Sequence, residues 1–225
     1  MTIIDSLKAC IFDFDGILVE SEPIFNRAWI KAASEYGYQI DESFFIQCYG
    51  LSLTDIKQIY FDRLGNDFPF GQIVEKVNAF FDEEIKAHGL PVRENALDVK
   101  SFFTQRGFKV AVASSTHIES LKTRLRKIKQ LHEFPVIVGG DEVSRSKPDP
   151  EIFLKAASLL KVEPQECLVL EDSENGTVAA KRAGMLVFIV KDLAPITARS
   201  RQHADAIFSS HGELLDFLKS KKHRQ

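Results

Sequence analysis

Cysteine is scarce in this chain of 225 residues, and its three copies, Cys10, Cys48 and Cys167, stand far apart in dissimilar contexts. An odd number of scattered cysteines argues against a disulfide framework and is typical of the reducing cytoplasm, where we expect the protein. Cys10 and Cys167 both lie in apolar, strand-like runs, so we interpret them as small buried hydrophobic residues. No cysteine or histidine spacing typical of a metal site is present.

Long apolar runs and an excess of one charge are also missing. No stretch approaches the roughly 20 apolar residues that cross a bilayer, so no membrane partner is expected. The first residues lack a basic region followed by an apolar core and a cleavage site, so we expect no secretory signal. A formal net charge of −3 gives no electrostatic footprint for nucleic acid. We therefore expect a globular protein with no nucleic-acid or membrane partner. Its oligomeric state stays open, with a monomer as the default.

Hydrophobic periodicity divides the chain into two regions with different patterns. One strand pattern at 8–14 is followed, from Pro23 to His88, by apolar residues spaced three and four apart, as amphipathic helices require. After Pro91, short apolar runs alternate with helical stretches. These strand-like runs lie at 109–115, 134–140, 167–171, 186–190 and 205–209. The alternation is typical of an α/β fold with a parallel sheet covered by helices on both faces.

The helical stretch between the first strand and the others predicts an inserted cap. We assign 1–16 and 93–225 to an α/β core domain and 17–92 to a helical cap domain. Within the core, Thr116 with Glu119 three residues later has the spacing of a capping box and predicts a helix start. A second helix is expected to open with Asp149 as its N-terminal cap and Pro150 at its first position.

Polar side chains gather where the predicted strands end. Ligands of an open parallel sheet bind beyond the carboxyl ends of its strands, so these residues are the candidates for a site. They are Asp13 and Asp15 after the first strand, Ser114 and Ser115 after the second, Glu171 and Asp172 at the end of 167–171, and Lys147 in a loop before a helix. Several carboxylates, hydroxyl groups and one ammonium group are thus predicted to meet at one edge.

Four motifs carry a family resemblance. The segments FDFDG (12–16), ASS (113–115), SKPDPEIF (146–153) and LEDSENG (170–176) resemble, in order and spacing, the four motifs of the haloacid dehalogenase superfamily. The likeness extends over essentially the whole chain and is strongest to the phosphatases with a small helical cap and their β-phosphoglucomutase relatives. It implies a Rossmann-like parallel sheet with an inserted small helical cap.

The resemblance also implies a magnesium-dependent phosphatase mechanism. By similarity, Asp13 is the nucleophile that becomes an aspartyl-phosphate, and Mg²⁺ keeps this carboxylate usable beside an anionic substrate. Asp13, the backbone carbonyl of Asp15 and Asp172 would supply the oxygen ligands that Mg²⁺ prefers. Glu171 would either orient a metal-bound water or support the ligands from behind.

The remaining roles follow from the same resemblance. Asp15 would protonate the leaving alkoxide and then activate water. Lys147 would balance the carboxylates and hold a phosphoryl oxygen, and Ser114, with Ser115, would donate hydrogen bonds to the other oxygens. Substrate-binding contacts are expected from Gly16, whose turn allows close approach of the backbone, and from the cap loop at Tyr49 and Gly50.

Departures from the mutase pattern favour hydrolysis of a small phosphorylated metabolite, such as a sugar phosphate. Where those relatives carry a histidine after the hinge, here LVESEP (18–23), this chain has Phe25. The cap-loop lysine and arginine are replaced by Tyr49 and Leu53. The loss of two cations removes the grip on a second phosphate. We therefore expect a substrate with one phosphate and an uncharged remainder.

Other activities stay open as alternatives. A β-phosphoglucomutase-like phosphosugar mutase is the nearest one, and a non-catalytic module that binds a phosphorylated ligand is the other. A dehalogenase would not need Asp15. A phosphonate hydrolase of this superfamily uses a Schiff-base lysine in the cap, but neither Lys31 nor Lys57 stands in a context that marks it out.

Overall fold

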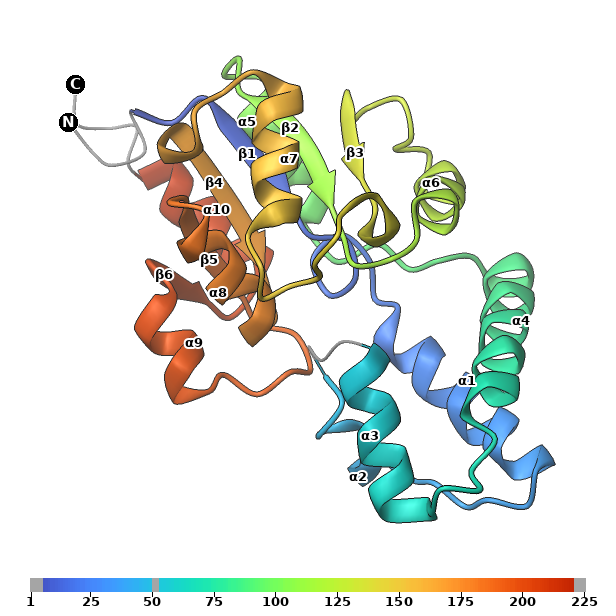
Figure 1. The fold of residues 1–225 in the computed structure, drawn as a ribbon. Helices are drawn as coiled ribbons and strands as arrows, with labels where there is room; N and C mark the ends of the chain where they lie inside the picture. Colours follow the sequence, from blue (N-terminus) through green and yellow to red (C-terminus); the bar gives the residue numbers. More distant parts are fainter. Residues whose placement is uncertain (1–5, 50–52, 221–225) are drawn as a thin grey trace.

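A parallel sheet forms the centre of the protein (Figure 1). The structure is a computed structural model and describes residues 6–49 and 53–220. The sheet has the order β3-β2-β1-β4-β5-β6, and every neighbouring pair is parallel. Its strands are β1 (Ala9–Phe12), β2 (Lys109–Ala113), β3 (Val136–Val138), β4 (Cys167–Glu171), β5 (Leu186–Val190) and β6 (Ala206–Phe208). The predicted α/β fold with a Rossmann-like parallel sheet is confirmed.

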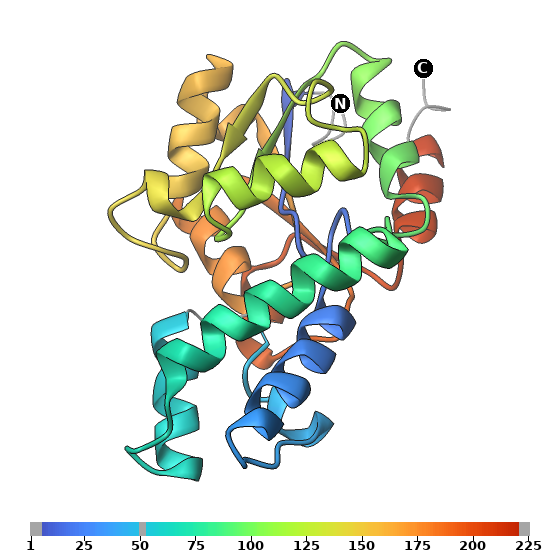
Figure 2. The same ribbon diagram turned by 90° about the vertical axis from the view of Figure 1, so that its right-hand side faces the viewer.

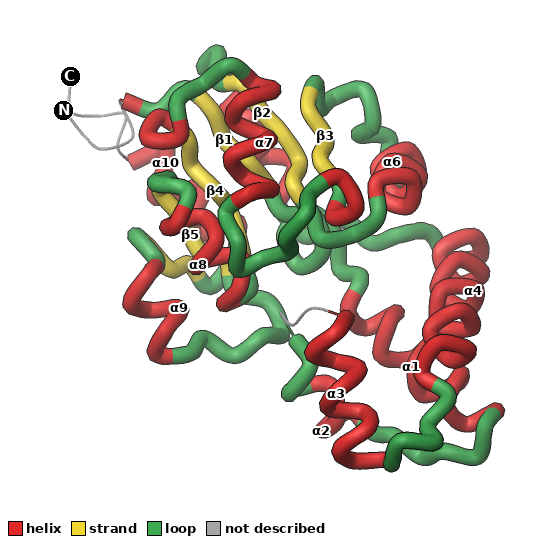
Figure 3. The backbone as a smooth tube through the Cα atoms, in the orientation of Figure 1, coloured by secondary structure: helices red, strands yellow, loops and turns green. Residues whose placement is uncertain are grey.

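Helices cover both faces of this sheet and form a separate group below it (Figures 1 and 3). They are α1 (Glu22–Glu35), α2 (Glu42–Phe45), α3 (Leu53–Leu64), α4 (Phe70–His88), α5 (Ala96–Thr104), α6 (Ile118–Lys127), α7 (Glu151–Leu160), α8 (Glu174–Arg182), α9 (Ala198–His203) and α10 (His211–Ser220). None of the described helices is both long and apolar enough to span a bilayer.

Strand β1 shows how the sheet is buried on both sides. Ala9 and Ile11 pack into the hydrophobic cluster that includes α7 and α8, whereas Cys10 and Phe12 pack into the cluster that includes α5 and α10. This division follows from the alternation of side chains along a strand. Phe14, which follows β1, belongs with the second set and is fully buried. The alternation therefore leaves the two aspartates beside it free to face a common site.

The helices α1–α4 form a block with its own hydrophobic cluster, and we call them the helical block (Figure 2). Tyr60, 1% exposed, lies at its centre between the rings of Trp29, Phe44 and Phe70. Aromatic pairs of this kind bury large apolar areas and stabilise a small core. Among the described residues of the block no strand is present, in agreement with the helical periodicity of the sequence.

Two chain segments, 18–20 and 91–93, connect the helical block to the sheet, and we call them the connecting segments. They run side by side: the amide of Glu20 donates to the carbonyl of Pro91 at 2.9 Å, and the amide of Arg93 donates to the carbonyl of Leu18 at 3.0 Å. No other described segment joins the helical block to the sheet covalently. Any rigid-body shift of the block must therefore pivot about this pair of segments.

The predicted helix start at Thr116 is wrong. Helix α6 begins at Ile118, and its N-terminal cap is His117, whose ring accepts a hydrogen bond from the amide of Glu119 at 3.4 Å. The Thr116 hydroxyl instead donates to Asp15 Oδ2 at 2.8 Å. A capping hydroxyl would accept a hydrogen bond from an amide of the first turn, but here the His117 ring takes that role and the Thr116 hydroxyl donates to a carboxylate.

The predicted start of the next helix is displaced by one residue. Helix α7 begins at Glu151 with Pro150 as its N-terminal cap, whereas Asp149 was expected there. The Asp149 side chain nevertheless accepts a hydrogen bond from the amide of Glu151 at 3.1 Å. Its carboxylate thus satisfies an amide of the first turn, as the sequence suggested.

The burial of His211 leads us to predict that the free energy of unfolding depends on pH. It is 1% exposed, and its Nε2 is the only fully buried side-chain nitrogen or oxygen without a partner among the described residues. Burial, and then the charge of Arg93, lower the pKa of His211 to about 4. An unfolded histidine has a pKa of about 6.5, so the neutral ring contributes stability that is complete above that pH and is lost as the pH falls toward 4.

We expect His211→Leu to remove this part of the acid sensitivity. Between pH 7 and pH 4.5 the variant should lose about 2 kcal/mol less free energy of unfolding than the wild type. Urea denaturation at both pH values measures the difference. His132→Leu, at an exposed position, is the matched control and should follow the wild type. Equal losses in wild type and His211→Leu would contradict the role given to the buried ring.

Candidate active site

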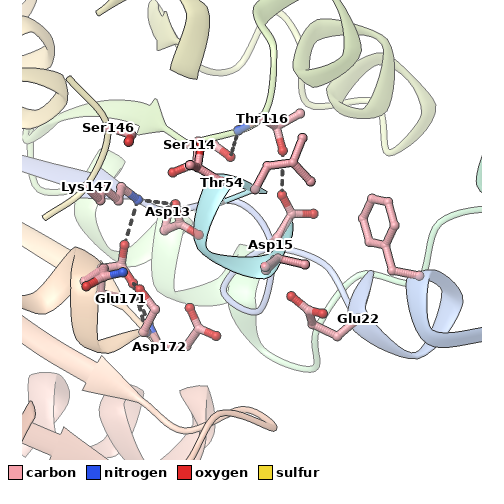
Figure 4. A pocket seen from close by; sticks show the side chains of 16 residues that line it. Asp13, Asp15, Glu22, Thr54, Ser114, Thr116, Ser146, Lys147, Glu171 and Asp172 are labelled. Carbon is pink, nitrogen blue, oxygen red and sulfur yellow. Dashed lines mark hydrogen bonds and ion pairs between the residues drawn. The ribbon is translucent and has the colours of Figure 1, made fainter. Parts of the chain in front are cut away.

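Lys147 joins the ends of two strands. Its side chain is 7% exposed, and its Nζ lies 2.6 Å from Asp13 Oδ1 and 2.7 Å from Glu171 Oε1 (Figure 4). The same ammonium donates to the carbonyl of Ala113 at 3.3 Å. A buried charge is tolerated when it is paired and hydrogen-bonded on all sides, as here. The loop before α7 therefore delivers one cation to the carboxyl ends of β1 and β4.

Glu171 is fully buried and uses both of its carboxylate oxygens. Oε1 is held by Lys147, and Oε2 accepts from the amide of Asp172 at 3.0 Å and from the amide and hydroxyl of Ser173 at 3.0 and 2.9 Å. Gly176 leaves room for it, because a Cβ there would lie 1.7 Å from Glu171 Oε1. This carboxylate is thus fixed by the start of α8, which fits a supporting position behind the site.

Asp15 is held by three donors from different parts of the chain. Ser21, in the segment before α1, donates to Oδ1 at 2.6 Å, and Thr116 donates to Oδ2 at 2.8 Å. Arg124 of α6 places Nη1 3.5 Å from Oδ1. None of these three partners was predicted to belong to the site. Only Thr116 had a usable signal, since it directly follows the predicted serine pair.

A cavity of about 480 Å³ lies over these groups, within the size range of small-molecule sites. It is lined by Asp13, Asp15, Glu22, Phe25, Leu53, Thr54, Ile56, Ser114, Ser115, Thr116, Ser146, Lys147, Glu171, Asp172, Ser173 and Asn175. The lining combines the carboxyl edge of the sheet with α1 and α3 of the helical block. Among these described residues, five are carboxylates and one is a lysine.

Two predicted binding residues, Gly16 and Tyr49, do not line this cavity. Gly16 is outside this lining but has φ +78°, and a Cβ there would stand 2.4 Å from Asp172 Oδ2, so only glycine fits the turn. Tyr49 is also outside the lining, and its hydroxyl accepts a hydrogen bond from Asn26 Nδ2 at 2.7 Å. Gly50 lies outside the described residues. Their substrate contacts stay predictions.

The carboxylates of the site crowd one another. Burial is the largest cause that raises the pKa of Asp13 to about 7, against the lowering effect of Lys147. Burial, then Glu171 and Asp13, raise the pKa of Asp172 well above its usual value. Burial, then Asp15, raise the pKa of Glu22 to about 8. Glu22, the first residue of α1, was not predicted as a site residue.

This surplus of buried negative charge fits a divalent cation. Oxygen atoms of Asp13, Glu171 and Asp172 lie within 4.8 Å of one another. Mg²⁺ prefers oxygen ligands and takes few of them from protein, and a cation among carboxylates lowers their pKa values again. The donor set present here therefore suits Mg²⁺, with Glu171 already engaged by Lys147 and Ser173.

An acid-lined cavity at the carboxyl edge of a parallel sheet, with one wall supplied by a helical block, is typical of an α/β enzyme that binds a small molecule. A family model described as "Haloacid dehalogenase-like hydrolase" matches residues 10–190. The chain belongs to this family.

Named relatives narrow the class further. The chain is 31% identical over 181 residues to a phosphorylated carbohydrates phosphatase of Thermotoga maritima, covering 80% of this chain and 82% of the relative. It is 29% identical to hexitol phosphatase B of Escherichia coli strain K12, with coverage of 82% and 83%. The crystal structure of CbbY from Rhodobacter sphaeroides in complex with phosphate superposes with a TM-score of 0.79 at 26% identity, covering 92% of this chain and 96% of that one. The predicted family and enzyme class, a phosphatase of the haloacid dehalogenase type, are confirmed.

Proposed function

We propose that the protein is a magnesium-dependent phosphatase that hydrolyses a small phosphorylated carbohydrate through an aspartyl-phosphate on Asp13. The observation that carries this proposal is the buried Lys147, which links Asp13 to Glu171 beside Asp172 at the cavity wall. Phosphoryl transfer depends on positioning and on neutralising charge, and this arrangement offers a carboxylate nucleophile, a fixed cation and a metal-ligand set.

The chemistry divides into two displacements. Asp13 attacks phosphorus, the bond to the ester oxygen breaks, and Asp15 gives its proton to the departing alkoxide. Asp15 then takes a proton from water, whose oxygen attacks the phosphorus of the aspartyl-phosphate, so that inorganic phosphate leaves and Asp13 is regenerated. Ser114, Ser115 and Lys147 line the same cavity and can hold the phosphoryl oxygens in both steps.

Mg²⁺ is the cofactor that this proposal requires. Asp13, Asp172 and the backbone carbonyl of Asp15 would hold it, with Glu171 supporting from behind. When bound, it neutralises charge that develops on the phosphoryl oxygens. Because carboxylates must be ionised to bind a metal, we expect tighter Mg²⁺ binding at pH 8 than at pH 5.5.

The helical block acts, in this proposal, as a cap domain comprising residues 17–92. The two connecting segments form a short hydrogen-bonded pair about which the block can tilt, and α1 and α3 supply one wall of the cavity. Closure of such a cap excludes water and selects the leaving group.

Substrate choice follows from the wall that the helical block contributes. The described lining residues of this wall are Glu22, Phe25, Leu53, Thr54 and Ile56, and none of them is a cation. The carboxyl group of Glu22 and the hydroxyl of Thr54 can hydrogen-bond to hydroxyl groups, whereas a second phosphate would meet no cation among the described lining residues of this side. A monophosphate with a neutral, hydroxyl-bearing remainder fits, as do the relatives named for phosphorylated carbohydrates and hexitols. The same wall disfavours the mutase alternative.

A turnover panel tests this function. We expect phosphate release from hexose, hexitol and pentose monophosphates with Mg²⁺, a loss of at least 100-fold in EDTA, and kcat/KM values for bisphosphates at least tenfold lower. Asp13→Asn serves as the blank. Activity that persists in EDTA would contradict the metal mechanism, and a preference for bisphosphates would contradict the substrate class. Ligand binding without turnover of any ester would favour the non-catalytic module.

A further inference from the structure

Glu22 is a mostly buried carboxyl group that faces the cavity without a protein partner. It is the first residue of α1 and lines the cavity, and Figure 4 shows its carboxyl group on the side where Asp15 lies. No described residue forms a hydrogen bond or ion pair with it, and Arg124 pairs with Asp15 instead. Because buried polar groups normally have hydrogen-bond partners, the missing partner of Glu22 is expected to come from a ligand.

The position of Glu22 is unfavourable as long as the cavity holds no ligand. Burial, and then the charges of Asp15 and two further aspartates, disfavour its ionised form and raise the pKa of Glu22 to about 8. The dipole of a helix favours a carboxylate in the first turn. Glu42, in the first turn of α2, obtains this benefit at an exposed position. Helix stabilisation alone therefore does not explain a carboxyl group that is turned toward other carboxylates.

A substrate hydroxyl is the group that completes this carboxyl group. The proposed substrate is an uncharged phosphorylated carbohydrate, and its hydroxyl groups can donate to a carboxyl oxygen, whereas an apolar substituent would leave that oxygen unsatisfied. Phe25 follows three residues later on the same face of α1 and also lines the cavity. Its ring, stacked on Phe81 with 4.1 Å between ring centres, accepts no such hydrogen bond. On α1 the hydroxyl contact therefore falls to Glu22.

The location of Asp15 determines which hydroxyl can reach Glu22. In the proposed mechanism Asp15 protonates the ester oxygen, so this oxygen lies against the Asp15 carboxyl group. Among all charges, that of Asp15 acts most strongly on Glu22, in agreement with the neighbouring positions of the two residues in Figure 4. A hydroxyl on the carbon next to the ester carbon is separated from the ester oxygen by only two carbon atoms. It therefore reaches the adjacent carboxyl group, whereas a hydroxyl farther along the chain points past it.

We propose that Glu22 selects phosphate monoesters that carry a free hydroxyl on the carbon next to the ester carbon. The inference rests on the proposed function, because it uses Asp15 as the acid at the ester oxygen. Open-chain polyol phosphates are then the favoured substrates, since in an alditol the carbon next to the terminal ester carbon bears a hydroxyl. A hexopyranose 6-phosphate carries its ring oxygen on that carbon and has no hydroxyl proton to donate there.

Two isomeric esters test this inference. 2-Hydroxypropyl phosphate, used as a racemate, has the adjacent hydroxyl, and 3-hydroxypropyl phosphate has the same atoms with the hydroxyl one carbon farther away. With Mg²⁺ we expect wild-type kcat/KM to be at least about tenfold higher for the first isomer. Glu22→Leu should bring this ratio close to one, whereas Glu22→Gln, which keeps a carbonyl acceptor, should retain most of it. Glu42→Leu, at the exposed first residue of α2, is the matched control and should keep the wild-type ratio.

A hexitol 6-phosphate and its 5-deoxy analogue repeat the comparison on a longer chain, and melting temperatures report the folding of each variant. A ratio near one in the pairs that the wild type cleaves would overturn the selection by Glu22 and leave the proposed function standing. An unchanged ratio in folded Glu22→Leu would do the same, and the wild-type comparison carries the test if this variant does not fold. Wild-type protein that cleaves none of the four esters with Mg²⁺ would overturn the proposed function, and with it the role of Glu22.

Discussion

Replacing Asp13 with asparagine is expected to lower kcat/KM for every accepted phosphate ester by at least about 10⁴-fold, the scale seen when a catalytic nucleophile is removed. An amide cannot form the acyl-phosphate, and the remaining groups can only position the substrate. Acid quenching with ³²P-labelled substrate should give labelled wild-type protein and unlabelled variant. Asp82→Asn, at an exposed position of α4, is the control and should match the wild type.

The same substitution is expected to preserve or raise stability at pH 8 in EDTA. The pKa of Asp13 is raised to about 7, so ionised Asp13 is penalised by burial in the folded state, and this penalty grows as the pH rises from about 4 to above 7. Asparagine removes the penalty and keeps the shape. Lys147 retains Glu171 and the carbonyl of Ala113 as partners. An inactive variant that is also unfolded, or one that still accepts the label, would contradict this account.

The sheet and the carboxylate–lysine centre were predictable because their signals are local. Buried parallel strands appear as short continuous apolar runs, and the order of such runs determines which strand ends meet. Asp13 and Asp15 flank a phenylalanine that packs into the core, which fixes the side on which both aspartates lie. Lys147 belongs to the short motif SKPDPEIF (146–153), at which α7 begins. The meeting of these residues in one cavity needed no knowledge of distant packing.

The second layer of the site was not predictable for the opposite reason. Arg124 lies in a helix whose pattern is that of a solvated, basic surface, and its burial appears only when α1 and α4 are packed against α6. Glu22 resembles an ordinary first-turn acid of α1, because its location over the cavity depends on the angle of the helical block. The hydrogen bond that Asn26 donates to the Tyr49 hydroxyl was equally out of reach, because the two residues are neighbours in space and not in sequence.

Lys147→Met is expected to destabilise the protein by about 3–5 kcal/mol, the range for breaking a buried ion pair by removing one partner. The substitution leaves Asp13 and Glu171 buried without their shared cation, which stood 2.6 and 2.7 Å from them. Since these carboxylates can then escape the penalty only by binding protons, the loss should be larger at pH 8 than at pH 5. Urea denaturation in EDTA at both pH values measures it.

Two further variants separate charge from packing in this effect. Lys155→Met, on α7 with a partly exposed pair to Glu142, is the matched control and should change stability by less than about 1 kcal/mol. The double variant Lys147→Met/Glu171→Gln removes one of the two unpaired carboxylates, so it should regain part of the lost stability without regaining turnover. If the double variant is less stable than Lys147→Met, the hydrogen bonds of the Glu171 carboxylate to Ser173 outweigh the penalty of its unpaired charge. Recovery of stability would instead show that the unpaired charge of Glu171 causes part of the destabilisation.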